Sequence, residues 1–196
     1  SKLYPREIVE CIRKYAKDNT PIVTDVGQHQ MWTAQYYKFK NPRTFISSGG
    51  LGAMGFGVGG AIGAAMATGR KTVLITGDGS FGMDMNELAT VGTYNIPLII
   101  LIMNNGTLGM VRQMQTMFFD GHYSQTTLHR KTDFVKLADA FGIKAKRILN
   151  ESELEPIIKE AFMQNEPFVI DCKIDINDRV LPMIPPNGTF DDLIIR

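Results

Sequence analysis

Two short polar segments, each following an apolar run, carry residue types that could bind a metal ion and a phosphate. Asp78 lies between two glycines in TVLITGDGSFG, and Asn104 and Asn105 follow the run PLIILIM at 97–103. Carboxylate and amide oxygens are hard ligands suited to Mg²⁺, which completes its octahedral shell with phosphate and water oxygens. The flanking glycines would let the backbone approach a phosphate, and the N–H of Ser80 would begin a helix whose amino end favours an anion. These residues therefore suggest the binding of a phosphate group through Mg²⁺.

The elements around these segments would bring the two segments together. Residues 80–103 supply one helix and one strand, so a right-handed crossover could place the two strand ends side by side. In an open parallel sheet, ligands bind outside the carboxyl ends of the strands. Asp78 and the asparagine pair are expected at that edge.

The whole chain alternates apolar strands with helices, which predicts an α/β fold of three α/β/α layers around a mostly parallel sheet. Strands are expected at 21–26, 43–47, 72–76, 97–103, 144–149 and 167–174, and helices at 5–17, from the glycine-rich run after 47, and at 85–94, 108–117, 133–141 and 152–164. A capping box of Ser152 and Glu155 should begin the last helix. Residues 1–180 are expected to form this domain, and residues 181–196 a proline-rich tail that lies over the surface or a partner.

Two other interpretations of the acid stay open on these residues. Asp78 could be the N-cap of a helix in a tight turn, with the asparagine pair forming a second turn. Alternatively, GGLGAMG at 49–55 contains G-x-G-x-x-G, the pattern recurs at 55–60, and Asp78 ends the following strand like the ribose-binding acid of a nicotinamide-type Rossmann site. A run so rich in glycine meets that pattern easily by chance, and a ribose-binding acid requires neither flanking glycine nor an asparagine pair one strand later. A P-loop is excluded because G-x-x-x-x-G-K-[ST] does not occur.

Composition and charge argue against several other classes of function. The chain has 196 residues, 44% apolar and 21% charged, which suffices for one sizeable core. Its net charge of +1 provides no field that would attract nucleic acid or an anionic membrane surface. The uncharged run at 47–69 contains too many glycines to face lipid, so no membrane span is expected.

Cysteine and histidine usage indicates a reducing, cytoplasmic location. Cys11 and Cys172 form no C-x-x-C pair and are expected to be buried free thiols, and the three histidines lack the spacing of a zinc site. No signal peptide is expected, because charges occur throughout residues 1–20. The beginning of the chain looks like a cut inside a longer protein.

Several sequence blocks resemble one enzyme family. G-D-G, followed after residues 80–103 by N-N, is similar to the signature of thiamine-diphosphate enzymes. Five blocks resemble the catalytic subunit of biosynthetic acetolactate synthase: VGQHQMW at 26–32, SGGLGAMGFG at 48–57, GDGSFGMDMNELAT at 77–90, NNGTLGMVRQ at 104–113 and VLPMIPPNG at 180–188. The resemblance covers nearly the whole chain, and it implies the carboxyl-terminal, diphosphate-binding domain with the thiamine-diphosphate-binding fold.

The resemblance also implies a set of binding residues. Mg²⁺ would be bound by Asp78, Asn105 and the backbone carbonyl of Thr107. The cofactor would be held by Gln28, His29, Gly52, Ala53, Met54, Gly77, Gly79, Ser80, Asn105, Thr107, Leu108, Gly109 and Met110. Met54 would be an apolar wedge beneath the bent cofactor, although a core methionine is the alternative. No catalytic residue is identified, because the family's activating glutamate belongs to an amino-terminal domain, and Glu87 is more simply a solvated or supporting residue.

The implied activity is the condensation of two pyruvates, or of pyruvate and 2-oxobutyrate, with loss of CO₂ in branched-chain amino-acid biosynthesis. Homodimers or tetramers, a regulatory subunit, and FAD held mainly by a middle domain are implied as well; this chain alone would bind cofactor weakly and catalyse nothing. Met114 stands where the family commonly has Trp, which leaves the preference for 2-oxobutyrate open, and GVGGAIGA replaces the usual GLPAAIGA. A related thiamine-diphosphate decarboxylase or acyltransferase, or a noncatalytic nucleotide-binding or assembly module, is the alternative.

Overall fold

The computed structural model describes residues 2–195 and contains, within that range, one six-stranded sheet in which all pairings are parallel. Its strands are β1 (Ile22–Thr24), β2 (Phe45–Ser47), β3 (Thr72–Gly77), β4 (Leu98–Asn104), β5 (Lys144–Ile148) and β6 (Phe168–Lys173). They lie in the order β2-β1-β3-β4-β6-β5. The predicted α/β class, with its mostly parallel sheet, is therefore confirmed.

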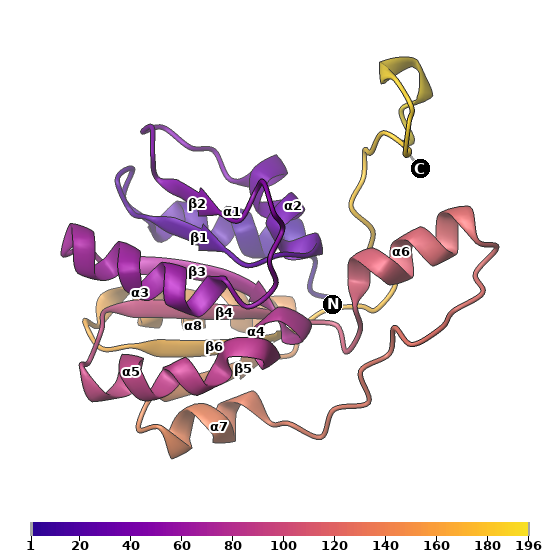
Figure 1. Cartoon of the computed structure of the whole chain (residues 1–196). Coiled ribbons are helices and arrows are strands. Elements are labelled where there is room, and N and C mark those ends of the chain that lie inside the picture. Colours follow the sequence, from indigo (N-terminus) through magenta and orange to yellow (C-terminus); the bar gives the residue numbers. More distant parts are fainter. Residues whose placement is uncertain (1, 196) are drawn as a thin grey trace.

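Helices cover both faces of the sheet, which makes three layers (Figure 1). One face carries α1 (Pro5–Tyr15), α2 (Gln28–Tyr36) and α8 (Glu151–Met163); the other carries α3 (Gly57–Thr68), α4 (Asp78–Asp84), α5 (Leu88–Thr93) and α7 (Phe134–Ala140). Side chains of the strands alternate between the two cores: Val73 and Ile75 of β3 join the first, and Leu74 joins the second. Both faces are thus buried, which explains why the central strands are apolar throughout.

Two segments project from this body in Figure 1. Helix α6 (Gly109–Phe118) extends beyond the carboxyl ends of the strands, and the chain after Val180 leaves the body beside it. A short 3₁₀ helix, η2 (Phe190–Asp192), lies near the end of that tail. The division of the chain into a domain and a tail at residue 180 stays a prediction.

The capping box expected at Ser152 and Glu155 is wrong. Helix α8 begins at Glu151 after the N-cap Asn150, and the Ser152 hydroxyl donates to Asn150 Oδ1 at 2.6 Å. The Glu155 carboxylate instead accepts hydrogen bonds from Lys14 and Tyr15 of α1. A contact between two helices distant in sequence therefore uses the residue that the local pattern assigned to the cap.

Other boundaries also differ from the expected ones. The helix expected at 85–94 starts earlier, as α4 at Asp78, and continues through the 3₁₀ turn η1 (Met85–Glu87) into α5. The glycine-rich run after 47 is not helical until Gly57, and a helix that was not expected, α2, follows Gly27. Cys172 is a buried free thiol as expected, whereas Cys11 is only partly buried. Within residues 2–195 no helix has the length and apolar character needed to cross a bilayer.

A pair of glycine substitutions tests the packing of the second core. In Gly92→Ala, the new Cβ of α5 would lie 2.5 Å from the Phe141 carbonyl oxygen, so we expect a loss of about 1–3 kcal/mol in the free energy of unfolding. The control Gly59→Ala on α3 meets no atom within 4 Å and should instead gain about 0.5–1 kcal/mol. Urea unfolding of both variants measures the difference, and equal effects would contradict the packing described.

Candidate functional site

The two polar segments meet at the carboxyl edge of the sheet. β3 and β4 are neighbours, with Gly77 opposite Met103, so the expectation that the two strand ends lie side by side is confirmed. Asp78 is the first residue of α4, its N-cap is Gly77, and no side chain caps that helix; the N-cap interpretation of Asp78 is therefore wrong. The glycine-rich run follows β2, an edge strand, whereas a Rossmann glycine loop follows a central strand of its sheet.

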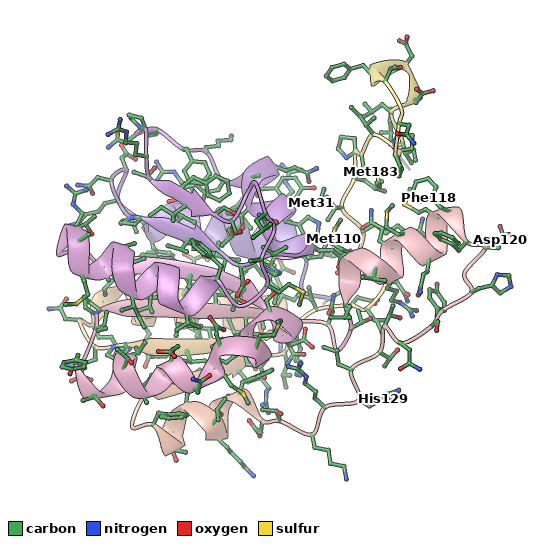
Figure 2. The ribbon with its side chains drawn as sticks, in the orientation of Figure 1. Met31, Met110, Phe118, Asp120, His129 and Met183 are labelled. Atoms are coloured by element: carbon green, nitrogen blue, oxygen red, sulfur yellow. The ribbon has the colours of Figure 1, made fainter. Side chains whose placement is uncertain are left out.

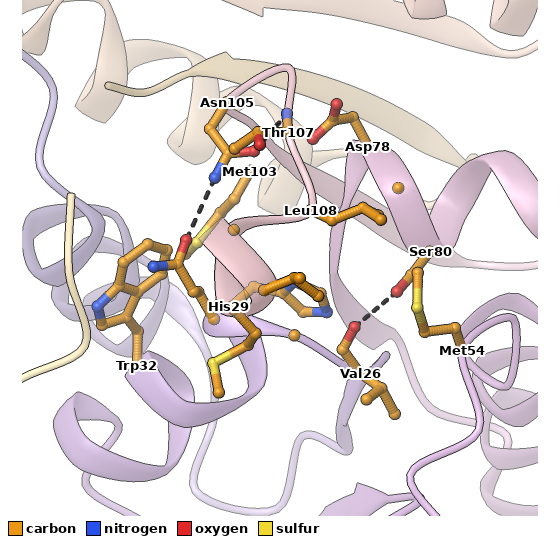
Figure 3. Close-up of a pocket in the computed structure, with 17 residues that line it drawn as sticks. Val26, His29, Trp32, Met54, Asp78, Ser80, Met103, Asn105, Thr107 and Leu108 are labelled. Carbon is orange, nitrogen blue, oxygen red and sulfur yellow. Dashed lines mark hydrogen bonds between the residues drawn. The ribbon is translucent and has the colours of Figure 1, made fainter. Parts of the chain in front are cut away.

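A cavity opens at this edge and is the centre of the site (Figure 3). Its volume is about 140 Å³, and it is open to solvent at its mouth. Most of the predicted site residues line it: Gln28, His29, Met54, Gly77, Asp78, Gly79, Ser80, Asn105, Thr107, Leu108, Gly109 and Met110. Gly52 and Ala53 do not line it; they lie on an exposed segment before Met54.

Five lining residues were not predicted: Val26, Gly27, Trp32, Met103 and Val111. Trp32 lies four residues after Gln28, which is about one turn along α2, and this spacing could have indicated it. Met103 is the residue of β4 that faces Gly77, so only the strand pairing reveals its position.

Asp78, Asn105 and Thr107 form the polar end of the cavity (Figure 3). Asn105 Oδ1 accepts a hydrogen bond from the Thr107 backbone N–H at 3.1 Å. Residue Asp78 is 4% exposed. Burial raises its pKa to about 6, although backbone N–H groups and the charges of Lys173 and Arg130 oppose that shift. A cation bound here would offset this burial cost. Among residues 2–195 no cluster of three or more His, Cys, Asp or Glu side chains could hold a metal.

Asn104 does not share the site with Asn105. Its side-chain amide donates to Asp171 Oδ1 at 2.8 Å, inside the sheet. Successive side chains of a strand point to opposite faces, so only one of two adjacent asparagines can face the cavity.

Gln28 is held in place by the protein itself. Its amide nitrogen donates to Gln113 Oε1 at 3.0 Å and to the Asp178 carbonyl at 2.9 Å, and its Oε1 accepts from Asn105 at 3.2 Å. Both N–H donors are therefore engaged, and Gln28 would have to release one of these bonds to donate to a phosphate. Gly109 packs against this amide so closely that a Cβ there would lie 2.0 Å from Gln28 Oε1.

His29 offers the free polar atom that Gln28 lacks. Its ring is buried, and Nε2 has no hydrogen-bond partner in the protein. Burial lowers the pKa of His29 to about 3, with partial opposition from a hydrogen bond to the Asp25 backbone, so the ring is neutral at neutral pH. An unpartnered buried nitrogen is costly unless a ligand or water satisfies it.

Two buried carboxylates fix the glycine-rich turn that carries Met54. Asp25 accepts from the backbone N–H groups of Gly55 at 3.0 Å and Gly57 at 3.2 Å, and Asp84 accepts from that of Val58 at 2.9 Å. Helix α3 has no side-chain cap of its own, so these acids satisfy its first N–H groups from other elements. Met54 is thereby held at the cavity opposite Gly79, where a Cβ would lie 3.6 Å from the Met54 methyl carbon.

The fold and this cavity define an α/β domain with a cavity at the carboxyl edge of a parallel sheet, where an acid and an amide that follow neighbouring strands converge. Residues 25–172 match the family described as thiamine pyrophosphate enzyme, C-terminal TPP binding domain, in which thiamine pyrophosphate is another name for thiamine diphosphate. The chain belongs to this family.

Similar proteins include three large subunits. A protein of Methanocaldococcus jannaschii named "Probable acetolactate synthase large subunit" is 48% identical over 90% of this chain and 30% of its own length. The acetolactate synthase large subunit of Lactococcus lactis is 43% identical over 97% of this chain and 33% of its own length, and the isozyme 3 large subunit of Escherichia coli is 40% identical over 98% and 34%. The chain spans about a third of the length of these relatives.

The Asp84 carboxylate should make the free energy of unfolding depend on pH. Burial raises the pKa of Asp84 to about 7. The charge of Asp25 adds to this rise and the hydrogen bond from the Val58 N–H opposes it, whereas in the unfolded chain the carboxyl has its ordinary pKa of about 3.8. Between these values the folded state holds a proton that the unfolded state releases, so this group lowers stability as pH rises from 4 to 7. Asp84→Asn keeps an acceptor for Val58 without the charge and should be more stable than the parent chain by about 1–3 kcal/mol at pH 8, with no gain at pH 4.

Urea unfolding at both pH values measures the Asp84 effect. Asp139→Asn, on the exposed face of α7, is the matched control and should change stability equally at the two pH values. A gain from Asp84→Asn that does not depend on pH would contradict the titration.

Proposed function

We propose that the cavity binds the diphosphate of thiamine diphosphate through Mg²⁺, and that the chain is the cofactor-binding part of an acetolactate synthase. The observation that carries this proposal is the convergence of buried Asp78 with Asn105 and Thr107 at one end of a largely apolar cavity. Family membership supports the cofactor, and the chemistry of the three oxygen donors supports a hard divalent cation.

The proposed metal ligands are the Asp78 carboxylate, Asn105 Oδ1 and the Thr107 backbone carbonyl. One lone pair of Asn105 Oδ1 accepts from the Thr107 N–H, which leaves the other for a cation. Gly79 and Ser80, in the first turn of α4, would donate backbone N–H groups to the diphosphate. The unpartnered Nε2 of His29 is a further contact for the ligand.

The apolar part of the cavity suits the rings of the cofactor. Met54, Met110, Leu108 and Trp32 line it, and we propose that Met54 supports the bent cofactor from below. When bound, thiamine diphosphate supplies the carbanion and electron sink for 2-oxoacid chemistry, while this chain binds and orients it. Gly77, Gly52 and Ala53 complete the proposed set of cofactor-binding residues. Gly52 and Ala53 would act indirectly, by fixing the position of Met54.

For the whole protein, we propose the reaction of its relatives: condensation of two pyruvates, or of pyruvate and 2-oxobutyrate, with loss of CO₂ in branched-chain amino-acid biosynthesis. Because the chain spans about a third of those relatives, the activating glutamate and an FAD site would lie outside it. A homodimer or tetramer, a regulatory subunit and a cytoplasmic location are parts of the same proposal. Met114, partly buried on α6, is the candidate for choosing the second oxoacid.

Titration with thiamine diphosphate, with and without Mg²⁺, tests the cofactor proposal. The single tryptophan, Trp32, lines the cavity, so its fluorescence should change on binding and only when Mg²⁺ is present. Asp78→Ala should weaken the Mg²⁺-dependent binding by at least about 100-fold, because Asp78 is the one charged group among the three proposed ligands. The control Asp139→Ala, on exposed α7, should bind like the parent chain.

Two results would overturn the proposal. Binding of thiamine diphosphate that ignores Mg²⁺ would remove the metal role, and unchanged affinity in Asp78→Ala would remove Asp78 from the ligand set. Binding of NAD in place of thiamine diphosphate would favour the dinucleotide alternative.

A further inference from the structure

The segment 126–133 contacts both parts of the chain that carry the proposed metal ligands, the beginning of α4 and the loop after β4. It returns from the projecting α6 to α7, past His129, along the carboxyl edge of the sheet (Figure 2). Thr127 pairs with Thr107 in an antiparallel bridge. The Leu108 N–H and the Thr107 hydroxyl both donate to the Thr126 carbonyl at 2.8 Å. The loop after Asn105 is therefore bound along its length to this segment.

The same segment also contacts the beginning of α4, which carries the proposed acidic ligand Asp78. Arg130 Nη1 donates to the Asp78 backbone carbonyl at 2.9 Å. The guanidinium lies so close to α4 that a Cβ on Gly82 would be 1.6 Å from Nη1. One segment thus fixes the backbone of Asp78 and of the Asn105–Leu108 loop relative to each other.

A partly buried ion network anchors the end of this segment to the sheet. Asp133, its last residue, accepts from the N–H groups of Val135 and Lys136 as the N-cap of α7, and from Arg147 Nη2 at 2.7 Å. Arg147 Nε in turn donates to Asp171 Oδ2 at 2.8 Å. Asp171 lies on β6 between the strands of its two partners, and it is fully buried.

The other oxygen of Asp171 leads back to the metal site. Oδ1 accepts from the side-chain amide of Asn104 at 2.8 Å, and Asn104 is the last residue of β4, immediately before Asn105. Both carboxylate oxygens are therefore engaged, one toward the end of β4 and one toward the 126–133 segment. A buried charge with both oxygens paired resists displacement, because breaking either contact would leave it uncompensated.

We propose that Asp171, with Arg147, Asp133 and Asn104, is a positioning network that sets the distance between the two ligand-bearing segments of the metal site, the beginning of α4 and the loop after β4. This inference rests on the proposed function, since it assigns a role to residues around the proposed Mg²⁺ ligands. The network touches neither metal nor cofactor, so its members are positioning residues. Loss of such an outer contact lowers metal affinity while the ligands themselves remain present.

The test measures the Mg²⁺ concentration that half-saturates the Trp32 signal at a fixed concentration of thiamine diphosphate. Arg147→Met, which removes both ion pairs and keeps the side-chain volume, should raise that concentration about 10- to 100-fold. Saturating Mg²⁺ should restore the full signal, because the ligands are intact but less well placed. Far-UV circular dichroism of the variant without ligand should match that of the parent chain. With the fold unchanged, restoration of the signal by Mg²⁺ reports on metal affinity and not on a folding defect.

Lys146→Met is the matched control. Lys146 is the neighbouring residue on β5 and pairs with Glu160 of α8, away from the network, so its loss should leave the half-saturating Mg²⁺ concentration unchanged. If Arg147→Met does not fold, Asp133→Asn replaces it, because Asn keeps the helix cap while the ion pair with Arg147 is lost. That variant should show a smaller rise in the same direction.

The outcomes separate this inference from the function on which it rests. If the parent chain gives no Mg²⁺-dependent signal, the proposed cofactor function fails and the network loses its role with it. If the parent chain binds but Arg147→Met, or Asp133→Asn in its place, matches Lys146→Met, the positioning role is overturned and the function stands. A shifted metal requirement in the network variant alone supports the proposal.

Discussion

The parallel pairing of β3 with β4 is the constraint on which the site depends. Both strands are buried along their whole length, and their backbone groups are satisfied by neighbouring strands. The carboxyl ends are the first places where the chain can present polar groups without breaking the ladder. Because the two strands are in register to Gly77 and Met103, Asp78 and Asn105 have to emerge close together. The strand order therefore determines where the cavity lies, and the side chains determine what it can bind.

Four buried carboxylates, those of Asp25, Asp78, Asp84 and Asp171, differ in how completely hydrogen bonds and ion pairs offset the cost of burying their charge. Asp171 has a cation and an amide, and Asp25 accepts three backbone N–H groups. Asp84 has one such bond and a second oxygen without a partner, and the pKa of Asp78 stays raised by burial despite its backbone contacts. Incomplete compensation is therefore found at the scaffold acid Asp84 as well as at the cavity, but only Asp78 faces the cavity, where a bound cation could supply the missing compensation.

Local patterns predicted the parts of this structure that depend on local physics. Apolar runs such as 97–103 indicated buried strands, and the crossover rule predicted that β3 and β4 are adjacent. The helix beginning at Asp78 was placed too late, because GDGSFG has low helix propensity and α4 is stabilised by the packing of Phe81 against Phe134. Asn104 was grouped with Asn105 because its partner, Asp171, is 67 residues away and no spacing reveals it. Contacts between distant residues decided each of these cases.

The same long-range contacts link the cavity to the two projecting parts of the molecule. Gln28 joins Asn105 to Gln113 of α6, and Gln113 in turn accepts from the Val180 N–H at 2.8 Å and donates to its carbonyl at 3.0 Å. Val180 is buried and is the point from which the tail leaves the body. Every amide in this chain of bonds is committed, so moving α6 or the base of the tail would leave a buried donor or acceptor unpaired beside Asn105. The geometry of Asp78, Asn105 and Thr107 at the polar end of the cavity therefore depends on where α6 and the tail begin. Neither α6 nor the tail contributes a side chain to that polar end.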